Sequence, residues 1–266
     1  GNMLINPWME IDQVNEGTVG TAGTTQTGVA AGTYTIHKRG DGWYTTDTVN
    51  TTVSITAVFQ NAAVSPTGSI TDMLYTVSTA SATAADGTIE TIEQRVEASK
   101  LAALQYGTAN AQPSYLQFCG KASIAGNYSF YILGGTSALT SSIHTTGSSY
   151  FQTFNVPVAA QWNCYNFVIP GDTAGTWLVN TPVVDTTHGA TLGFVMGANG
   201  TSTDKYTGTA CVSGVWANGV QNCVAPNTGQ VLMSKTAGAT FELTSVKWAL
   251  DNQPLIHAPQ FELMEA

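Results

Sequence analysis

YSFYIL (128–133) is the stretch that decides the fold, because its side chains alternate with a period of two. Its first, third and fifth residues, Tyr128, Phe130 and Ile132, fall on one side of an extended chain, and the other three fall on the opposite side. This alternation is typical of a half-buried antiparallel strand. The same period recurs in five further stretches, at residues 52–59, 73–77, 88–96, 150–156 and 165–169.

The segments between these stretches are rich in Gly, Asn, Pro and Asp, which end strands and form turns. The whole pattern predicts about ten short strands. EASKLAAL (97–104) is the only stretch that indicates a helix, and FELTSVKWAL (241–250) changes phase at Thr244–Ser245, which predicts a β-bulge. No repeat of fixed period is present, which argues against a propeller or β-helix. The sequence therefore predicts an all-β jelly-roll sandwich.

The first forty residues differ in character from the rest. LINPWMEIDQ (4–13) is apolar, and we expect it to dock on the body as a strand or to form an interface. EGTVGTAGTTQTGVAAGTYT (16–35) is low in complexity and predicts a long loop or a weakly specified edge hairpin. We therefore divide the chain into an extended N-terminal arm with a Gly/Thr-rich segment (1–40) and a jelly-roll sandwich (41–266).

The composition excludes several classes of partner. Only 9% of the 266 residues are charged, the net charge is −9, and the eight basic residues are scattered except for Lys38-Arg39. Nucleic-acid backbones and anionic membranes require clustered Lys and Arg, so neither is an expected partner. No apolar run is long enough for a transmembrane helix, and no secretory signal opens the chain. Because Gly1 is not an initiator Met, we expect a fragment or a processed chain.

No catalytic motif stands in the sequence. The best carboxylate pair is Glu93 and Glu97, which would share a strand face with Arg95, while Glu90 points to the other face. A glycosidase needs two carboxyls about 5 to 9.5 Å apart across a cleft. An arginine between the two acids is more simply explained by a solvated ladder of ion pairs, so we predict that the chain is not an enzyme.

Metal and acid–base sites have weak support. His188 with Asp185 in DTTHG is the best local pair, although a surface-loop histidine explains it equally simply. Asp41, Asp47 and Asp172 lie in loops that could hold a structural calcium ion, as does Asp204, but no calcium-loop motif is present. We predict no other cofactor and name no metal ligands.

Neutral-saccharide binding is the chemistry that the polar, aromatic composition favours. It requires a flat ring that stacks on the sugar and amides that bind hydroxyl groups. Trp216 lies in GVWANGVQN beside Asn218, Gln221 and Asn222, which makes these four residues the predicted saccharide site. The alternative for Trp216 is core packing, which is the common fate of tryptophan. The other aromatic candidates are Trp8, Trp43, Tyr44, Tyr106, Trp162 and Trp177, of which Trp43 and Trp162 are expected in the core together with Trp248.

Six sequence segments, in their order along the chain, resemble those of a family of bacteriophage and prophage tail-fibre or virion-surface domains with a carbohydrate-binding-module-like jelly roll. The segments are LINPWMEIDQ (4–13), DGWY (41–44), EQRVE (93–97), SYLQFCGKASIAGNYSFYI (114–132), NCYNFVIPGDTAGTW (163–177) and ATFELTSVKWAL (239–250). The resemblance implies a non-catalytic virion protein, with adhesion to host surface polysaccharide. It supplies no catalytic or binding residues, and the C-terminal segment follows the family pattern only loosely, so the position in the virion stays open.

The expected partners follow from that resemblance. They are other virion proteins, further copies of the chain with a trimer favoured, and a host cell-surface glycan. Leu4, Ile5, Trp8 and Met9 are the predicted subunit interface, since they would otherwise form an exposed apolar patch. The alternative is a capsid- or tail-decorating subunit that acts only through protein contacts. A third is a polysaccharide depolymerase, which would need an acidic pair such as one that includes Glu93.

The four cysteines fall into two pairs of contexts. Cys119 and Cys164 lie in apolar-aromatic strand-like runs, which favours buried free thiols. Cys211 and Cys223 flank a Gly/Asn-rich loop and could close a disulfide. Assembly of a virion in a reducing cytoplasm would work against that bond.

Overall fold

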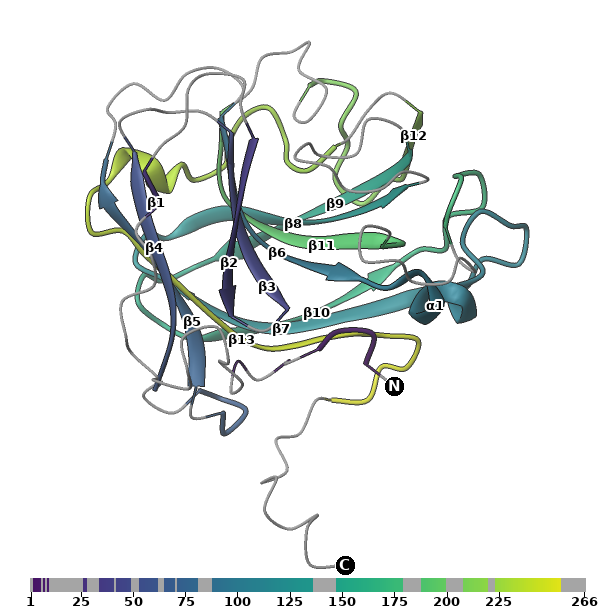
Figure 1. The fold of residues 1–266 in the computed structure, drawn as a ribbon, viewed down its shortest axis with the longest axis horizontal. Coiled ribbons are helices and arrows are strands. Elements are labelled where there is room, and N and C mark those ends of the chain that lie inside the picture. Colours follow the sequence, from purple (N-terminus) through teal and green to yellow (C-terminus); the bar gives the residue numbers. More distant parts are fainter. Residues whose placement is uncertain are drawn as a thin grey trace, which may run out of the picture.

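Two antiparallel sheets packed face to face make up the computed structural model of the protein (Figure 1). The structure describes residues 2–5, 7, 9, 26–27, 34–40, 42–48, 53–61, 65–69, 71–80, 88–135, 147–178, 188–199, 208–219 and 223–254. The six-stranded sheet has the order β1 (Gln26–Thr27), β4 (Ser54–Asn61), β5 (Thr71–Thr79), β13 (Thr240–Ala249), β7 (Ser114–Ala122) and β10 (Asn163–Ile169).

The second sheet has seven strands. Its order is β12 (Ala217–Gly219), β9 (Gly147–Val156), β8 (Gly126–Gly135), β11 (Ala190–Asn199), β6 (Thr88–Val96), β3 (Trp43–Thr48) and β2 (Tyr34–Gly40). The described helices are one turn each: α1 (Ala98–Leu101), η1 (Ala102–Leu104) and η2 (Met233–Lys235). The predicted all-β jelly-roll sandwich is therefore confirmed, and so is the short helix that was expected after β6.

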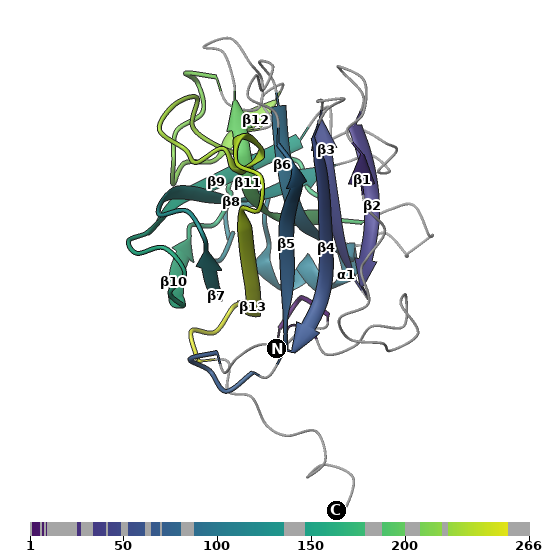
Figure 2. The same ribbon diagram turned by 90° about the vertical axis from the view of Figure 1, so that its left-hand side faces the viewer.

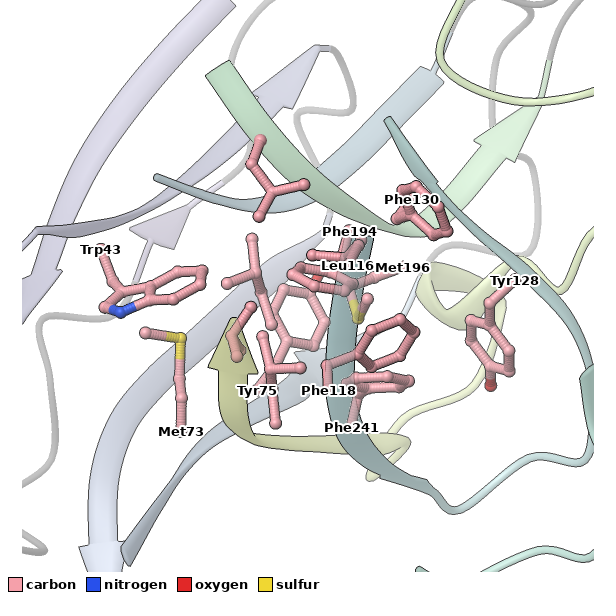
Figure 3. Packing of buried hydrophobic residues seen from close by; sticks show 14 of the residues in the cluster. Trp43, Met73, Tyr75, Leu116, Phe118, Tyr128, Phe130, Phe194, Met196 and Phe241 are labelled. Atoms are coloured by element: carbon pink, nitrogen blue, oxygen red, sulfur yellow. The ribbon is translucent and has the colours of Figure 1, made fainter. Parts of the chain in front are cut away.

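The core is aromatic because the inward positions of both sheets carry rings. Phe118 of β7 lies with its ring centroid 4.8 Å from that of Phe194 in β11 and 6.2 Å from that of Phe130 in β8, and Figure 3 shows these rings meeting between the sheets. Trp43 and Trp248 are fully buried, as predicted. Trp162 is not in the core: it is half-buried, and the ammonium group of Lys121 lies 5.4 Å from its ring centroid.

The seven-stranded sheet is also covered on its outer face, which the alternation did not indicate. Tyr131 and Leu133, the outward residues of β8, are almost completely buried in a second apolar cluster with Val224. The disulfide between Cys211 and Cys223 belongs to this cluster and closes the segment that covers it. One of the two outcomes left open for this cysteine pair, a disulfide, is thus the observed one.

The N-terminal segment docks on the body of its own chain. The backbone N–H of Met3 donates to the carbonyl oxygen of Trp248 at 2.9 Å. Leu4 and Met9 are buried in the core, whereas Ile5 is 46% exposed. Trp8 lies outside the described residues. Of the predicted interface residues, Ile5 is therefore the described side chain that remains open to a partner, and the interface itself stays a prediction.

Two further details concern the predicted elements. The register between β13 and β7 shifts between Thr244 and Lys247, and Ser245 has a φ of 58°, which confirms the predicted bulge. Strands β1 and β2 both fall within residues 1–40 and pair with β4 and β3 respectively, so these two pieces belong to the sandwich itself. None of the described helices is long and apolar enough to cross a membrane.

Candidate functional site

Trp216 lies against the core of the sandwich. Its ring centroid is 5.4 Å from those of Tyr106 and Trp177 and 5.2 Å from that of Tyr150. The indole N–H donates to the backbone oxygen of Pro170 at 2.7 Å, and the side chain is half-buried. Three ring contacts and a satisfied N–H make packing the main role of Trp216.

The turn after β10 fixes Trp177 beside Trp216. Asp172 is 2% exposed, and its Oδ1 accepts the backbone N–H groups of Ala174 and Gly175 at 3.2 and 3.1 Å. Its Oδ2 accepts the indole N–H of Trp177 at 2.7 Å. The turn and the Trp216 loop, which the sequence indicated as separate places, therefore form one aromatic cluster.

The backbone of β8 makes room for this cluster. A Cβ atom at Gly134 would lie 2.4 Å from the Trp177 ring, so the indole can lie on the strand only because that residue is glycine. Burial raises the pKa of Tyr106, and it raises the pKa of Tyr150 to about 12. Both phenols therefore stay neutral, and that of Tyr106 shares a 2.8 Å hydrogen bond with the hydroxyl of Ser114.

The remaining predicted saccharide residues are only partly described. Asn218 is exposed on β12, and its Oδ1 accepts the hydroxyl of Ser148 at 2.7 Å. Gln221 and Asn222 lie outside the described residues. The structure thus places Trp216 just before β12 and Asn218 on that strand but gives them different environments, the first packed and the second open to solvent.

A groove with a volume of about 320 Å³ lies on the outer face of the six-stranded sheet. Residues of β7 and β10 line it, together with Thr67, the bulge residue Ser245, Asn252 and Pro254. Its volume is in the range of small-molecule sites in proteins. None of the described residues that line it is charged, although Lys121 lies on β7 and Lys247 on the neighbouring strand β13.

Three amides line this groove and order one another. Asn252 Oδ1 accepts hydrogen bonds from Asn166 Nδ2 at 2.7 Å and from Gln117 Nε2 at 3.1 Å. The hydroxyls of Thr67 and Ser245, which also line the groove, are 2.6 Å apart. Because Asn252 Oδ1 already accepts two hydrogen bonds, the side chain of Asn252 can offer a ligand its N–H groups as donors. Asn166 can offer a ligand its Oδ1 as an acceptor. We name this set of five side chains the amide groove.

A disulfide also lines the groove. Cys119 and Cys164 face each other on β7 and β10 and are bonded. The expectation of two buried free thiols is wrong, because Cys164 is exposed and directly opposite Cys119 in the register. Each cysteine lies in an apolar run, but its side chain points to the outer face of the sheet, opposite to the stacked rings of Phe118, Tyr165 and Phe167.

The sequence did not identify the amide groove. Gln117 and Asn166 occupy outward positions of β7 and β10, next to the inward rings of Phe118, Tyr165 and Phe167, and they pair directly in the register. Asn252 comes from the segment after the last strand, and Thr67 from the loop before β5. A polar residue at an outward strand position is normal for a solvent-facing sheet, so only the register could bring these residues together.

Two carboxylates meet on neighbouring strands of the same sheet. Asp72 on β5 is fully buried, and the adjacent Glu242 of β13 forms a 2.7 Å ion pair with Lys121. Burial, followed by repulsion from Glu242, raises the pKa of Asp72 to about 7. Asp72 therefore holds its proton below neutral pH and loses it as the pH rises through about 7.

The predicted carboxylate ladder has a different structure from the one expected. Glu93 is only 3% exposed, and its Oε2 accepts the phenol O–H of Tyr131 at 2.8 Å. The phenol reaches across β11 at Gly193, where a Cβ atom would lie 2.1 Å from the ring. The expectation of a solvated ladder is wrong for Glu93, because the outer cluster buries it.

The other two members of that ladder are also separated. The guanidinium of Arg95 lies 5.1 Å from the ring centroid of Tyr44, a cation–π arrangement. Glu97 follows the end of β6 and is the residue before the first turn of α1, where it is exposed. Glu93 and Glu97 are therefore not a pair of acids that face each other from one strand.

His188 is 8% exposed, so it is a buried residue and not the surface-loop residue that the sequence suggested; Asp185 lies outside the described residues. Within the described ranges, no three His, Cys, Asp or Glu side chains gather into a group that could hold a metal ion. Asp172, one of the loop acids considered for calcium, uses both carboxylate oxygens for the hydrogen bonds of its own turn.

Comparison with known proteins gives no family for the chain. No protein-family model matches the sequence, and no curated protein matches it either. Among solved structures, one similar chain is a putative sugar-binding protein from Bacteroides thetaiotaomicron, at 12% identity and a TM-score of 0.40, with 94% of this chain and 99% of the other covered.

Two further structures are similar at the same level. The family 11 carbohydrate-binding module of a Clostridium thermocellum cellulase is 11% identical, with a TM-score of 0.37 and 86% and 99% of the two chains covered. The enzymatically active domain of bacteriophage CBA120 tailspike protein 4 is 12% identical, with a TM-score of 0.36; 78% of this chain covers 19% of the tailspike chain. Likenesses at these TM-scores carry no argument about function.

Proposed function

We propose that this chain is a non-catalytic saccharide-binding domain that attaches a phage-like particle to a host surface glycan. The observation that supports it most is the amide groove. Amide groups offer a donor and an acceptor in one plane, which matches the paired hydroxyls of a sugar ring. Because none of its described lining residues is charged, the groove favours a neutral saccharide over an acidic one.

The polar side chains of the groove are also pre-organised for binding. The shared bonds at Asn252 hold Asn166 and Gln117 in fixed positions, and the Cys119–Cys164 disulfide fixes the distance between β7 and β10. Ordered polar groups cost less conformational entropy on binding than mobile ones. The resemblance to virion-surface domains supports the location on a particle.

Binding to a panel of neutral and acidic oligosaccharides, measured by calorimetry, tests the proposal with two matched variants. Asn252→Ala removes the shared acceptor of the groove, whereas Asn110→Ala removes an exposed amide from the loop after η1. We expect about a tenfold or larger loss of affinity for Asn252→Ala and no change for Asn110→Ala. Equal binding by both variants would refute the groove as the site, and a failure of the native chain to bind any saccharide would refute the function.

A structural subunit that acts only through protein contacts is the second candidate. It is favoured by the exposed apolar side chains of Ile5 and Val168, at 46% and 59% exposure. A chain of this type would bind assembled particles but no free saccharide. Co-sedimentation with particles, with and without competing host polysaccharide, separates the two candidates.

A depolymerase is the third candidate and has less support. Glu93 is buried and hydrogen-bonded to Tyr131, and the amide groove has no acid among its lining residues. Release of reducing sugar from host polysaccharide that is abolished by Glu93→Gln would establish this candidate and remove the non-catalytic proposal.

A further inference from the structure

The four strands at the sheet margins are protected to different degrees. Edge strands expose unpaired backbone groups, and proteins usually blunt them by shortness or by charge. β1 has two residues and β12 has three, while the sequence of β2, YTIHKRG, includes two basic residues. β10 has seven residues, NCYNFVI, without a charge or a proline. Among the four described edge strands, β10 is thus a long one that carries no charged residue.

The backbone of β10 shows which residues face the open side. In antiparallel pairs the Cα atoms of non-hydrogen-bonded residues are closer, about 4.5 Å against about 5.5 Å. Cys164 and Cys119 are directly opposite with a Cα–Cα distance of 4.1 Å, so they form a non-hydrogen-bonded pair. The backbone N–H and C=O groups of Cys164, and by alternation those of Asn166 and Val168, therefore point away from β7.

Those groups have no partner strand in the described part of the chain. β10 pairs with β7 alone, and none of the described backbone hydrogen bonds outside the sheets reaches it. Figure 2 shows β10 at the outer left of the molecule. The side chains of Cys164 and Asn166 are exposed, and that of Val168 is 59% exposed.

We propose that β10 pairs with the β10 of a second copy, in an antiparallel two-fold dimer centred on Asn166. In this register Asn166 lies opposite its own counterpart, and Cys164 lies opposite Val168 of the other copy. The three residues then form about six backbone hydrogen bonds across the axis. The outward side chains match as well, because an amide meets an amide and the small disulfide sulfur meets an apolar valine.

Charge also favours a second copy at this place. Two chains with a net charge of −9 repel each other over most approaches, whereas β10 brings no charged side chain to the contact. The Cys119–Cys164 disulfide and the inward stacking of Tyr165 and Phe167 on Phe118 hold the strand in a fixed shape. A rigid edge loses little entropy when it pairs.

The dimer would join the six-stranded sheets of the two copies, edge to edge, into one continuous sheet. Asn166 is both the centre of the proposed contact and a member of the amide groove, so the two grooves would lie side by side across the axis. A dimer of this kind would bind a polymeric glycan at two places at once, which raises its avidity. The dimer itself does not depend on the saccharide proposal.

Sedimentation over a wide concentration range tests the dimer with three variants. Val168→Lys adds a charge at the contact, and Val168→Pro removes an N–H that points to the open side without removing a bond to β7. Val158→Lys adds the same charge at an apolar residue of the turn before β10, where the side chain is 47% exposed. We expect the native chain and Val158→Lys to dimerise equally, and both Val168 variants to dissociate at least about tenfold more readily.

Amide hydrogen exchange of the native chain gives a second measurement that needs no variant. In a dimer the amides of Cys164, Asn166 and Val168 exchange slowly at high concentration and rapidly at low concentration. The amides of Tyr165 and Phe167, which bond to β7, exchange slowly at both. Rapid exchange at the three outward amides at high concentration, a purely monomeric or trimeric mass, or a dimer unaffected by both Val168 variants would each overturn the proposal.

Saccharide-binding measurements show whether the dimer proposal, the proposed function or both have failed. A monomeric Val168→Lys chain that binds a short oligosaccharide as tightly as the native dimer, but binds host polysaccharide more weakly, supports both proposals. A native monomer that binds the oligosaccharide overturns the dimer alone. A native dimer that binds no saccharide leaves the dimer and overturns the proposed function.

Discussion

Asn166 and Asn252 are 86 positions apart in the chain, and a 2.7 Å hydrogen bond joins the Nδ2 of the first to the Oδ1 of the second. The bond connects the outermost strand of a sheet to the segment that follows the last strand. Through this bond, two polar residues from distant segments line the same groove. The contact can therefore contribute both to the stability of the fold and to the fixed geometry of the groove.

Asn252→Asp separates the structural part of that contact from its part in binding. The carboxylate still accepts the bonds from Asn166 and Gln117, but it has no N–H to offer a ligand. We expect an unchanged melting temperature and about a tenfold weaker affinity for neutral saccharide, which corresponds to about 1.4 kcal/mol. Calorimetry beside a thermal melt provides both values. A large fall in melting temperature with unchanged affinity would assign Asn252 to the fold alone.

Asp72 makes the stability of the chain depend on pH. The pKa of this carboxyl is about 7 in the folded protein and 3.8 as its ordinary value, so the folded state holds the proton more tightly. The stabilisation from this proton is complete below about pH 4 and is lost as the pH rises to about 7. Asp72→Asn cannot lose a proton, so we expect it to gain stability relative to the native chain between pH 5 and 8. Denaturant unfolding at several pH values measures the difference; parallel curves for the two proteins would contradict the assignment.

Removal of the disulfides should destabilise the chain to different extents. Cys119 and Cys164 enclose a sequence separation of 45, whereas Cys211 and Cys223 enclose 12. Chain-entropy arguments give the longer loop about 1 kcal/mol more stabilisation than the shorter one. We expect a paired Cys→Ser replacement at 119 and 164 to lower the free energy of unfolding more than the paired replacement at 211 and 223. Equal losses, measured by denaturant unfolding, would show that loop length does not decide the order.

Trp216→Ala distinguishes packing from saccharide contact. Loss of a half-buried indole with three ring contacts should cost about 2 to 4 kcal/mol of unfolding free energy. We expect this loss of stability with little change in the saccharide affinity of the chain that remains folded. The opposite result, a stable variant that no longer binds, would return Trp216 to the role that the sequence suggested for it.

The sequence by itself determined the class of fold and several local features. Short runs with a period of two between turn-forming residues, as at 52–59 with Val53 and Ile55 on one face, indicate strands, so the all-β class follows from the pattern. The phase change at Thr244–Ser245 likewise required the bulge that the structure contains. Such features depend on neighbours in the chain, which is why they can be read without coordinates.

Only the tertiary structure decided which outward residues meet. Glu93 is buried and bonded to Tyr131, a residue of the apolar cluster on the outer face of the seven-stranded sheet, and Cys119 bonds Cys164 because the register puts them opposite each other. The amide groove likewise depends on strand order, since Gln117, Asn166 and Asn252 share no local pattern. Contacts between distant segments are set by register and by covering loops, and a single sequence carries no periodic signal for either.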